Sequence, residues 1–122
     1  MAVSYSLEGP LLRMELAGTY DPEDVVREFE AAVADPRCPD PVSLLVDVTR
    51  SESLASRSPS QIRFVAESLG PYVKRINGRV AVVAIEDLHF GFSRMGSAYS
   101  ENVGVEAAIF RDPEEARRWL GV

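Results

Sequence analysis

Five segments of the chain carry the apolar patterns of β-strands, either alternating with polar residues or running almost unbroken. These segments are 3–7, 11–17, 42–48, 79–85 and 105–110. The first two alternate and are separated by Gly9-Pro10, which predicts an antiparallel hairpin. The third and fourth contain continuous runs such as Leu44-Leu45-Val46, which are typical of strands covered on both faces of a parallel sheet.

Four helices are predicted between and after these strands, because apolar residues recur there at helical spacing behind capping residues. Their predicted starts are Asp21-Pro22, Ser58-Pro59, Asp87 and Asp112-Pro113. The first helix should end at Asp35, since Pro36 disfavours helical geometry in the residue before it. The second begins with a capping box, in which Ser58 and Gln61 bond each other's backbone, and is interrupted at Gly70-Pro71 before its pattern resumes.

The third helix is rich in glycine and serine, which makes it intrinsically weak. Its large apolar residues recur at helical spacing and are expected to form its buried stripe: Leu88, Phe92, Met95, Tyr99 and Val103. Small residues such as Gly91 and Gly96 would allow the close approach of another helix, a ligand or a second copy of the chain. A homodimer is therefore one expected assembly.

The order of elements is strand, strand, helix, strand, helix, strand, helix, strand, helix. It predicts an α/β domain with a five-stranded mixed sheet, an N-terminal hairpin and flanking helices. A length of 122 residues fits one domain, and no linker or repeat divides the chain. We therefore expect a single domain over residues 1–122.

Composition narrows the range of functions. One cysteine, Cys38, and one histidine, His89, allow neither an internal disulfide nor a Cys/His zinc cage, so no metal or cofactor is expected. The longest apolar run, 80–85, is too short to span a membrane, and the N-terminus lacks the features of a signal peptide. A cytoplasmic protein is expected. The net charge of -6 opposes nucleic-acid binding.

The segment after the third strand is the candidate working surface, because ligands meet α/β sheets at the carboxyl ends of their strands. Five of the ten residues 51–60 are serine. Residues 50–79 hold six basic and two acidic side chains, whereas the other residues hold seven and seventeen. This local positive charge predicts a site for a protein partner or a small anionic ligand. Its candidate residues are Asp47, Thr49, Arg50, Ser56, Arg57 and Ser58.

The order of elements and three stretches of sequence resemble the STAS domains, and more narrowly the bacterial SpoIIAA-like proteins of the anti-sigma-factor antagonist family. The stretches are Leu45-Val46-Asp47, Arg79-Val80-Ala81-Val82-Val83 and Phe110-Arg111-Asp112-Pro113-Glu114-Glu115-Ala116-Arg117-Arg118-Trp119-Leu120. The resemblance implies a STAS-like domain. Antagonist STAS domains carry an Asp-Ser-Ser/Thr-Gly motif after the third strand, whose serine a partner kinase phosphorylates. Residues 54–59 lack that aspartate and glycine, so phosphorylation of Ser56 or Ser58 is a hypothesis to test.

The preferred hypothesis is a non-enzymatic regulatory or interaction module that binds through residues 49–60. Ser58 also has a purely structural explanation as a helix cap. The alternative is a small carrier of an apolar or lipid-like ligand, since STAS-like domains resemble the Sec14 class in architecture. The candidate cleft residues lie on the third helix: Phe90, Phe92, Met95 and Tyr99.

An enzyme is the third hypothesis, with Asp47 and His89 beside a serine. The sequence lacks the Gly-x-Ser-x-Gly turn that presents a nucleophilic serine between a strand and a helix. Catalysis is therefore not expected.

Overall fold

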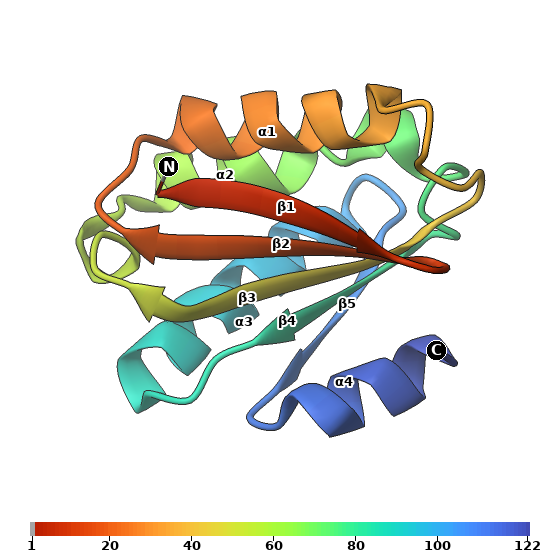
Figure 1. Cartoon of the computed structure of the whole chain (residues 1–122). Helices are drawn as coiled ribbons and strands as arrows, with labels where there is room; N and C mark the ends of the chain where they lie inside the picture. Colours follow the sequence, from red (N-terminus) through yellow and green to blue (C-terminus); the bar gives the residue numbers. More distant parts are fainter. Residues whose placement is uncertain (1) are drawn as a thin grey trace.

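The computed structural model describes residues 2–122 and has the predicted order of elements (Figure 1). The strands are β1 (Val3–Glu8), β2 (Leu11–Gly18), β3 (Ser43–Ser51), β4 (Arg79–Val83) and β5 (Glu106–Phe110). The helices are α1 (Pro22–Ala34), α2 (Pro59–Glu67), α3 (Asp87–Glu101) and α4 (Pro113–Leu120). Two short 3₁₀ turns, η1 (Leu54–Ser56) and η2 (Gly70–Tyr72), flank α2. The predicted α/β class with a five-stranded mixed sheet is confirmed.

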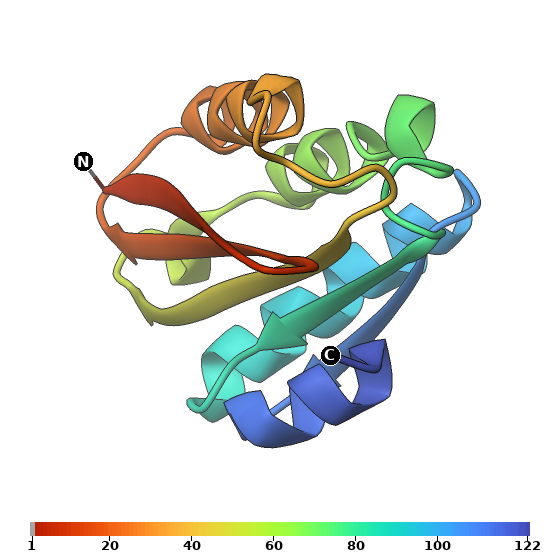
Figure 2. The same cartoon turned by 45° about the vertical axis from the view of Figure 1, so that its right-hand side comes forward.

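The strands lie side by side in their order along the chain. β1 and β2 pair antiparallel, and every later neighbour pairs parallel. Because each parallel crossover turns with the same right hand, α1, α2 and α3 pack on one face of the sheet. α4 packs on the other face, against β3, β4 and β5, and Figures 1 and 2 show it across the sheet from α3.

Strand alternation divides the core between these two faces. Leu44 and Leu45, each 1% exposed, belong to different apolar clusters on opposite sides of β3. The larger cluster lies under α1, α2 and α3 and contains residues such as Met14 and Phe29. The smaller cluster lies under α4 and contains Ala116. Both faces of the central strands are thus buried, as their continuous apolar runs predict.

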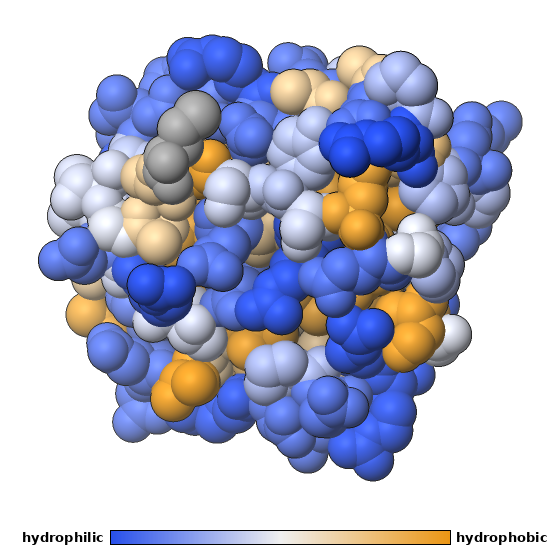
Figure 3. Space-filling model, in the orientation of Figure 1, coloured by the Kyte–Doolittle hydropathy of each residue, from blue (hydrophilic) through white to orange (hydrophobic). Residues whose placement is uncertain are grey.

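None of the described helices covers β1 and β2 on the α4 side of the sheet. We call this surface, formed by β1, β2 and the adjoining part of β3, the open face. Alternate residues of these strands point to it and are polar: Ser4, Ser6, Glu8, Arg13, Glu15 and Asp47. Figure 3, which views this side, shows hydrophilic residues over most of it.

β3 extends further than its sequence pattern predicts, and it continues through Thr49 and Arg50 to Ser51. Its pairing with β2 shifts at an irregularity between Glu15 and Ala17. Such a bulge changes the alternation of side chains locally. The first part of the predicted loop 49–60 is therefore strand, which decides where its side chains point.

The predicted buried stripe of α3 is wrong in part. Leu88 is 57% exposed, whereas His89 and Ser100 are buried. Val103 packs against the larger cluster, as predicted. The most buried side of the helix is offset by about one position, or about 100°, from a stripe that begins at Leu88. Gly96 faces α2, where a Cβ added to it would lie at an ordinary contact distance of 3.5 Å from Cγ2 of Ile62. A smaller correction is that Glu86, and not Asp87, is the N-cap.

The capping box at the start of α2 is confirmed. The Gln61 backbone N–H donates to Ser58 Oγ at 3.2 Å, and the Ser58 N–H donates to Gln61 Oε1 at 2.9 Å. Replacing Ser58 with alanine should lower the free energy of unfolding by about 1 kcal/mol, because the backbone N–H of Gln61 then loses its acceptor. Chemical denaturation measures this loss. Ser58→Asp keeps an acceptor and should retain most of the stability; an equal loss in both variants would contradict the capping role.

Candidate functional site

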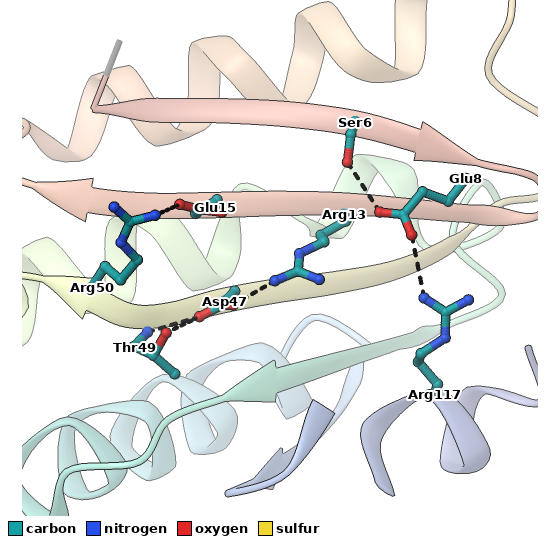
Figure 4. A network of polar contacts seen from close by, with 8 residues as sticks. All are labelled: Ser6, Glu8, Arg13, Glu15, Asp47, Thr49, Arg50 and Arg117. Carbon is teal, nitrogen blue, oxygen red and sulfur yellow. Dashed lines mark hydrogen bonds and ion pairs between the residues drawn. The ribbon is translucent and has the colours of Figure 1, made fainter. Parts of the chain in front are cut away.

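The predicted site residues divide between the two faces of the sheet. Asp47, Thr49 and Arg50 lie on the open face (Figure 4). Arg57 lies on the helix-covered side, where it contacts Tyr20 of the larger core cluster. The two arginines therefore do not converge on one anion. Strand geometry explains the division, since the bulge leaves Thr49 and Arg50 on the side of Asp47.

Asp47 is 6% exposed and fully engaged in contacts within the sheet. Its Oδ2 accepts from Arg13 Nη2 at 2.9 Å. Its Oδ1 accepts from the Thr49 backbone N–H at 2.9 Å and from the Thr49 hydroxyl at 2.6 Å. These bonds hold β2 to the bulged end of β3. Asp47 and Thr49 thus have a structural role that explains their burial.

The other charges of the open face also pair with one another (Figure 4). Arg50 Nη1 lies 2.9 Å from Glu15 Oε1. Glu8 accepts from Ser6 Oγ at 3.2 Å and pairs with Arg117 of α4 at 3.4 Å. Each arginine of this network faces a carboxylate, so the open face offers no unbalanced positive charge among the described residues.

Arg57 is held differently. Its Nη2 donates to the Tyr20 carbonyl oxygen and, at 3.1 Å, to Ser53 Oγ. The guanidinium carbon lies 5.2 Å from the centroid of the Tyr20 ring, within cation–π range. The Tyr20 hydroxyl lies 2.6 Å from Ser51 Oγ, and burial raises the pKa of this hydroxyl above its usual value. The phenol therefore stays neutral beside the cation.

The serines of the segment differ in accessibility. Ser51 and Ser53 are buried and bonded to Tyr20, whereas Ser56 and Ser58 are exposed. The Ser56 hydroxyl donates to the Ser53 carbonyl oxygen at 2.8 Å within η1. Ser58 is occupied as the helix cap. Ser56 is therefore the freer of the two candidate positions.

An apolar cavity of about 150 Å³ lies between the sheet and helices α1, α2 and α3. Its wall on the sheet includes Val46 and Val82. α3 contributes mostly small residues: Ser93, Gly96, Ser97 and Ser100. Arg57 and Gln61 bring polar groups to the lining near the start of α2. The cavity thus joins an apolar interior to one cationic side chain.

The four cleft residues predicted on α3 lie in different places. Phe92 lines the cavity. Phe92 and Met95 also border a more open depression on α3. Phe90 packs under Arg111, whose guanidinium carbon lies 4.6 Å from the ring centroid. Tyr99 is half-buried and does not line the cavity. The main walls come from residues that the sequence did not single out, chiefly on the strands and α2.

His89 is buried, at 5% exposure, and its Nδ1 has no hydrogen-bond partner among the described residues. It extends from α3 on the helix-covered face, whereas Asp47 points to the open face. The sheet therefore separates the two residues, and the Ser-His-Asp arrangement is not assembled. Within residues 2–122, no three His, Cys, Asp or Glu side chains gather as metal ligands. None of the described helices has the length and apolar character to cross a bilayer.

Comparison with protein-family models gives no match, and the search of curated proteins finds no similar sequence. Among solved structures, the chain is similar to the crystal structure of an uncharacterized protein from Shewanella loihica PV-4, described as a DUF3478 family protein with a SpoIIAA-like fold. The TM-score is 0.59 over 98% of this chain and 92% of that chain, with 21% sequence identity. The predicted SpoIIAA-like fold is confirmed.

Two of the ion pairs on the open face, Arg13–Asp47 and Arg50–Glu15, should differ in their effect on stability. Asp47→Ala should lower the free energy of unfolding by about 1–3 kcal/mol, because it leaves partly buried donors of Arg13 and Thr49 without their acceptor. Glu15→Ala breaks the more exposed pair with Arg50 and should cost less than about 1 kcal/mol. Urea denaturation of both variants measures the difference. Equal losses would show that Asp47 does not hold the strands as described.

Proposed function

We propose that the protein is a non-enzymatic binding module of SpoIIAA-like fold that holds a small apolar ligand in the cavity under α1, α2 and α3. The cavity itself is the observation that carries this proposal. Enclosed apolar cavities of about this volume bind molecules such as benzene, and the partial opening of this one to solvent gives a ligand access. The walls of Val46, Val82 and Phe92 provide this kind of lining.

The apolar lining of the cavity supports the proposal. The cavity is partly open to solvent, so its apolar wall is exposed to water when no ligand is bound, and burying apolar surface is favourable by roughly 25 cal/mol per Å². An apolar ligand that fills the space would recover contacts that the side chains do not make. This function agrees with the carrier that the Sec14-like resemblance implies.

A second candidate is a regulatory module controlled by phosphorylation of Ser56. The observation that favours it is the exposure of Ser56 within a segment whose Ser51 and Ser53 are buried. A phosphate there would add negative charge beside Arg57 and could change how η1 meets a protein partner. This candidate needs no cavity, so the two functions are tested separately.

Toluene should raise the melting temperature of the protein in a saturable way, because it binds the native cavity and not the unfolded chain. Ala66→Leu adds carbon atoms on the cavity wall and should abolish this shift. Ala31→Leu makes the same change at an exposed position of α1 and serves as the matched control. Differential scanning calorimetry measures the shifts. Absence of any saturable shift in the unmodified protein would refute binding in the cavity.

Phosphopeptide mapping of the protein isolated from its own cells tests the second candidate. The expected result is phosphate on Ser56, with Ser51 and Ser53 unmodified because their hydroxyls are buried. A Ser56→Ala chain expressed in the same cells provides the control for site assignment. An unmodified segment 54–63 under all growth conditions would remove this candidate.

A further inference from the structure

We infer that the ligand of the cavity is a small carboxylic acid, whose apolar part fills the space and whose carboxylate pairs with Arg57. This inference rests on the proposed apolar binding function and adds the chemical class of the ligand. It is carried by two features that meet at the start of α2. One is the cavity, and the other is a half-buried cation that forms no ion pair with a carboxylate of the described residues.

The charge balance of the arginines distinguishes Arg57. Eight of the twelve arginines in the chain form ion pairs within the described residues: Arg13, Arg27, Arg37, Arg50, Arg63, Arg75, Arg111 and Arg117. Of the others, Arg94 and Arg118 are exposed, and Arg79 stacks on Trp119 at α4. Arg57 alone is both unpaired and part of the cavity lining.

The donors of Arg57 are only partly used. Its contacts with the Tyr20 carbonyl oxygen and Ser53 Oγ both involve Nη2. A guanidinium has five N–H donors in a planar fork that fits a carboxylate in two-point geometry. Nε and Nη1 make no hydrogen bond to the described residues, so one edge of the fork is available. A cation removed partly from water without a counter-charge is unfavourable, and an anionic ligand would relieve that cost.

The nearby acidic group of α1 is already engaged. Asp24 accepts from the Asp21 backbone N–H at 3.0 Å and from Arg27 Nη1 at 2.9 Å. It therefore serves the start of α1 and its own helix partner. The neutral phenol of Tyr20 supplies no negative charge either. The bond from the Asp21 N–H lowers the pKa of Asp24 most, and Arg57 is one of the charges that lower it further. The side chains of Arg57 and Asp24 form no hydrogen bond or ion pair, however, so Arg57 has no direct carboxylate partner among the described residues.

The size of the cavity limits the apolar part of the ligand. A space of about 150 Å³ accommodates roughly one six-membered ring, by analogy with cavities of that volume that bind benzene. A long acyl chain would exceed it. The class that fits both features is a monocarboxylic acid with one ring or a short chain. Gln61, which also lines the cavity, can add a hydrogen bond through its side chain.

The test compares 3-phenylpropionate, its neutral amide and toluene by isothermal titration calorimetry. The unmodified protein should bind the carboxylate at least about tenfold more tightly than the amide, a difference of about 1.4 kcal/mol. Arg57→Gln should remove this preference while leaving toluene binding intact. Arg63→Gln is the matched control on α2, because Arg63 is exposed and paired with Glu67 at 3.0 Å, and it should keep the preference.

The outcomes separate this inference from the proposed function. Failure of toluene to bind would overturn binding in the cavity, and the inference with it. Toluene binding without a preference for the carboxylate over the amide would overturn the inference and leave the cavity function standing. If Arg57→Gln does not fold, Arg57→Lys replaces it in the test: it retains the charge and should keep a reduced preference for the carboxylate.

Salt gives an independent test in the unmodified protein. Loss of the preference for the carboxylate over the amide with added salt would confirm an ionic contact, and no change would contradict it.

Discussion

The small side chains that α3 turns toward the sheet control how the helix layer packs. Gly96 allows α3 to lie against Ile62 of α2, and Ser97 and Ser100 bond main-chain oxygens near β5. These contacts fix the position of α3 without filling the volume beneath it. Apart from Phe92, the residues of α3 that line the space below it are small. The small side chains of this helix thus leave room for the cavity between α3, Val46 and Val82.

A second constraint is the bulge where β3 passes β2. It leaves Thr49 and Arg50 on the open face, while Ser51 returns to the helix-covered side and bonds Tyr20. The chain then passes through η1 and places Arg57 beside the same tyrosine. Residues 47–57 therefore contribute to two surfaces. Asp47, Thr49 and Arg50 belong to the ion-pair network of the open face, and Arg57 lines the cavity.

Local patterns predicted most of the fold. The hairpin, the buried strands and the caps at Asp21, Ser58 and Asp112 follow from spacing and turn chemistry, and the structure has them. The rotation of α3 could not be predicted, because the stripes that begin at Leu88 and at His89 have the same period. Contacts with the rest of the fold place the less apolar stripe, which begins at His89, toward the core. The cavity depends on that placement and on side chains from separate strands, so no local motif shows it.

The same strand geometry explains why basic residues that are close in sequence do not form one cluster. Arg50 and Arg57 are close in sequence, yet Arg50 faces Glu15 and Arg57 faces a neutral tyrosine. On the open face every described arginine has a carboxylate, so folding already satisfies its charges. At the cavity, an apolar space and a cation without an ion-pair partner among the described residues lie together. A single amphipathic anion, as proposed, would match both features.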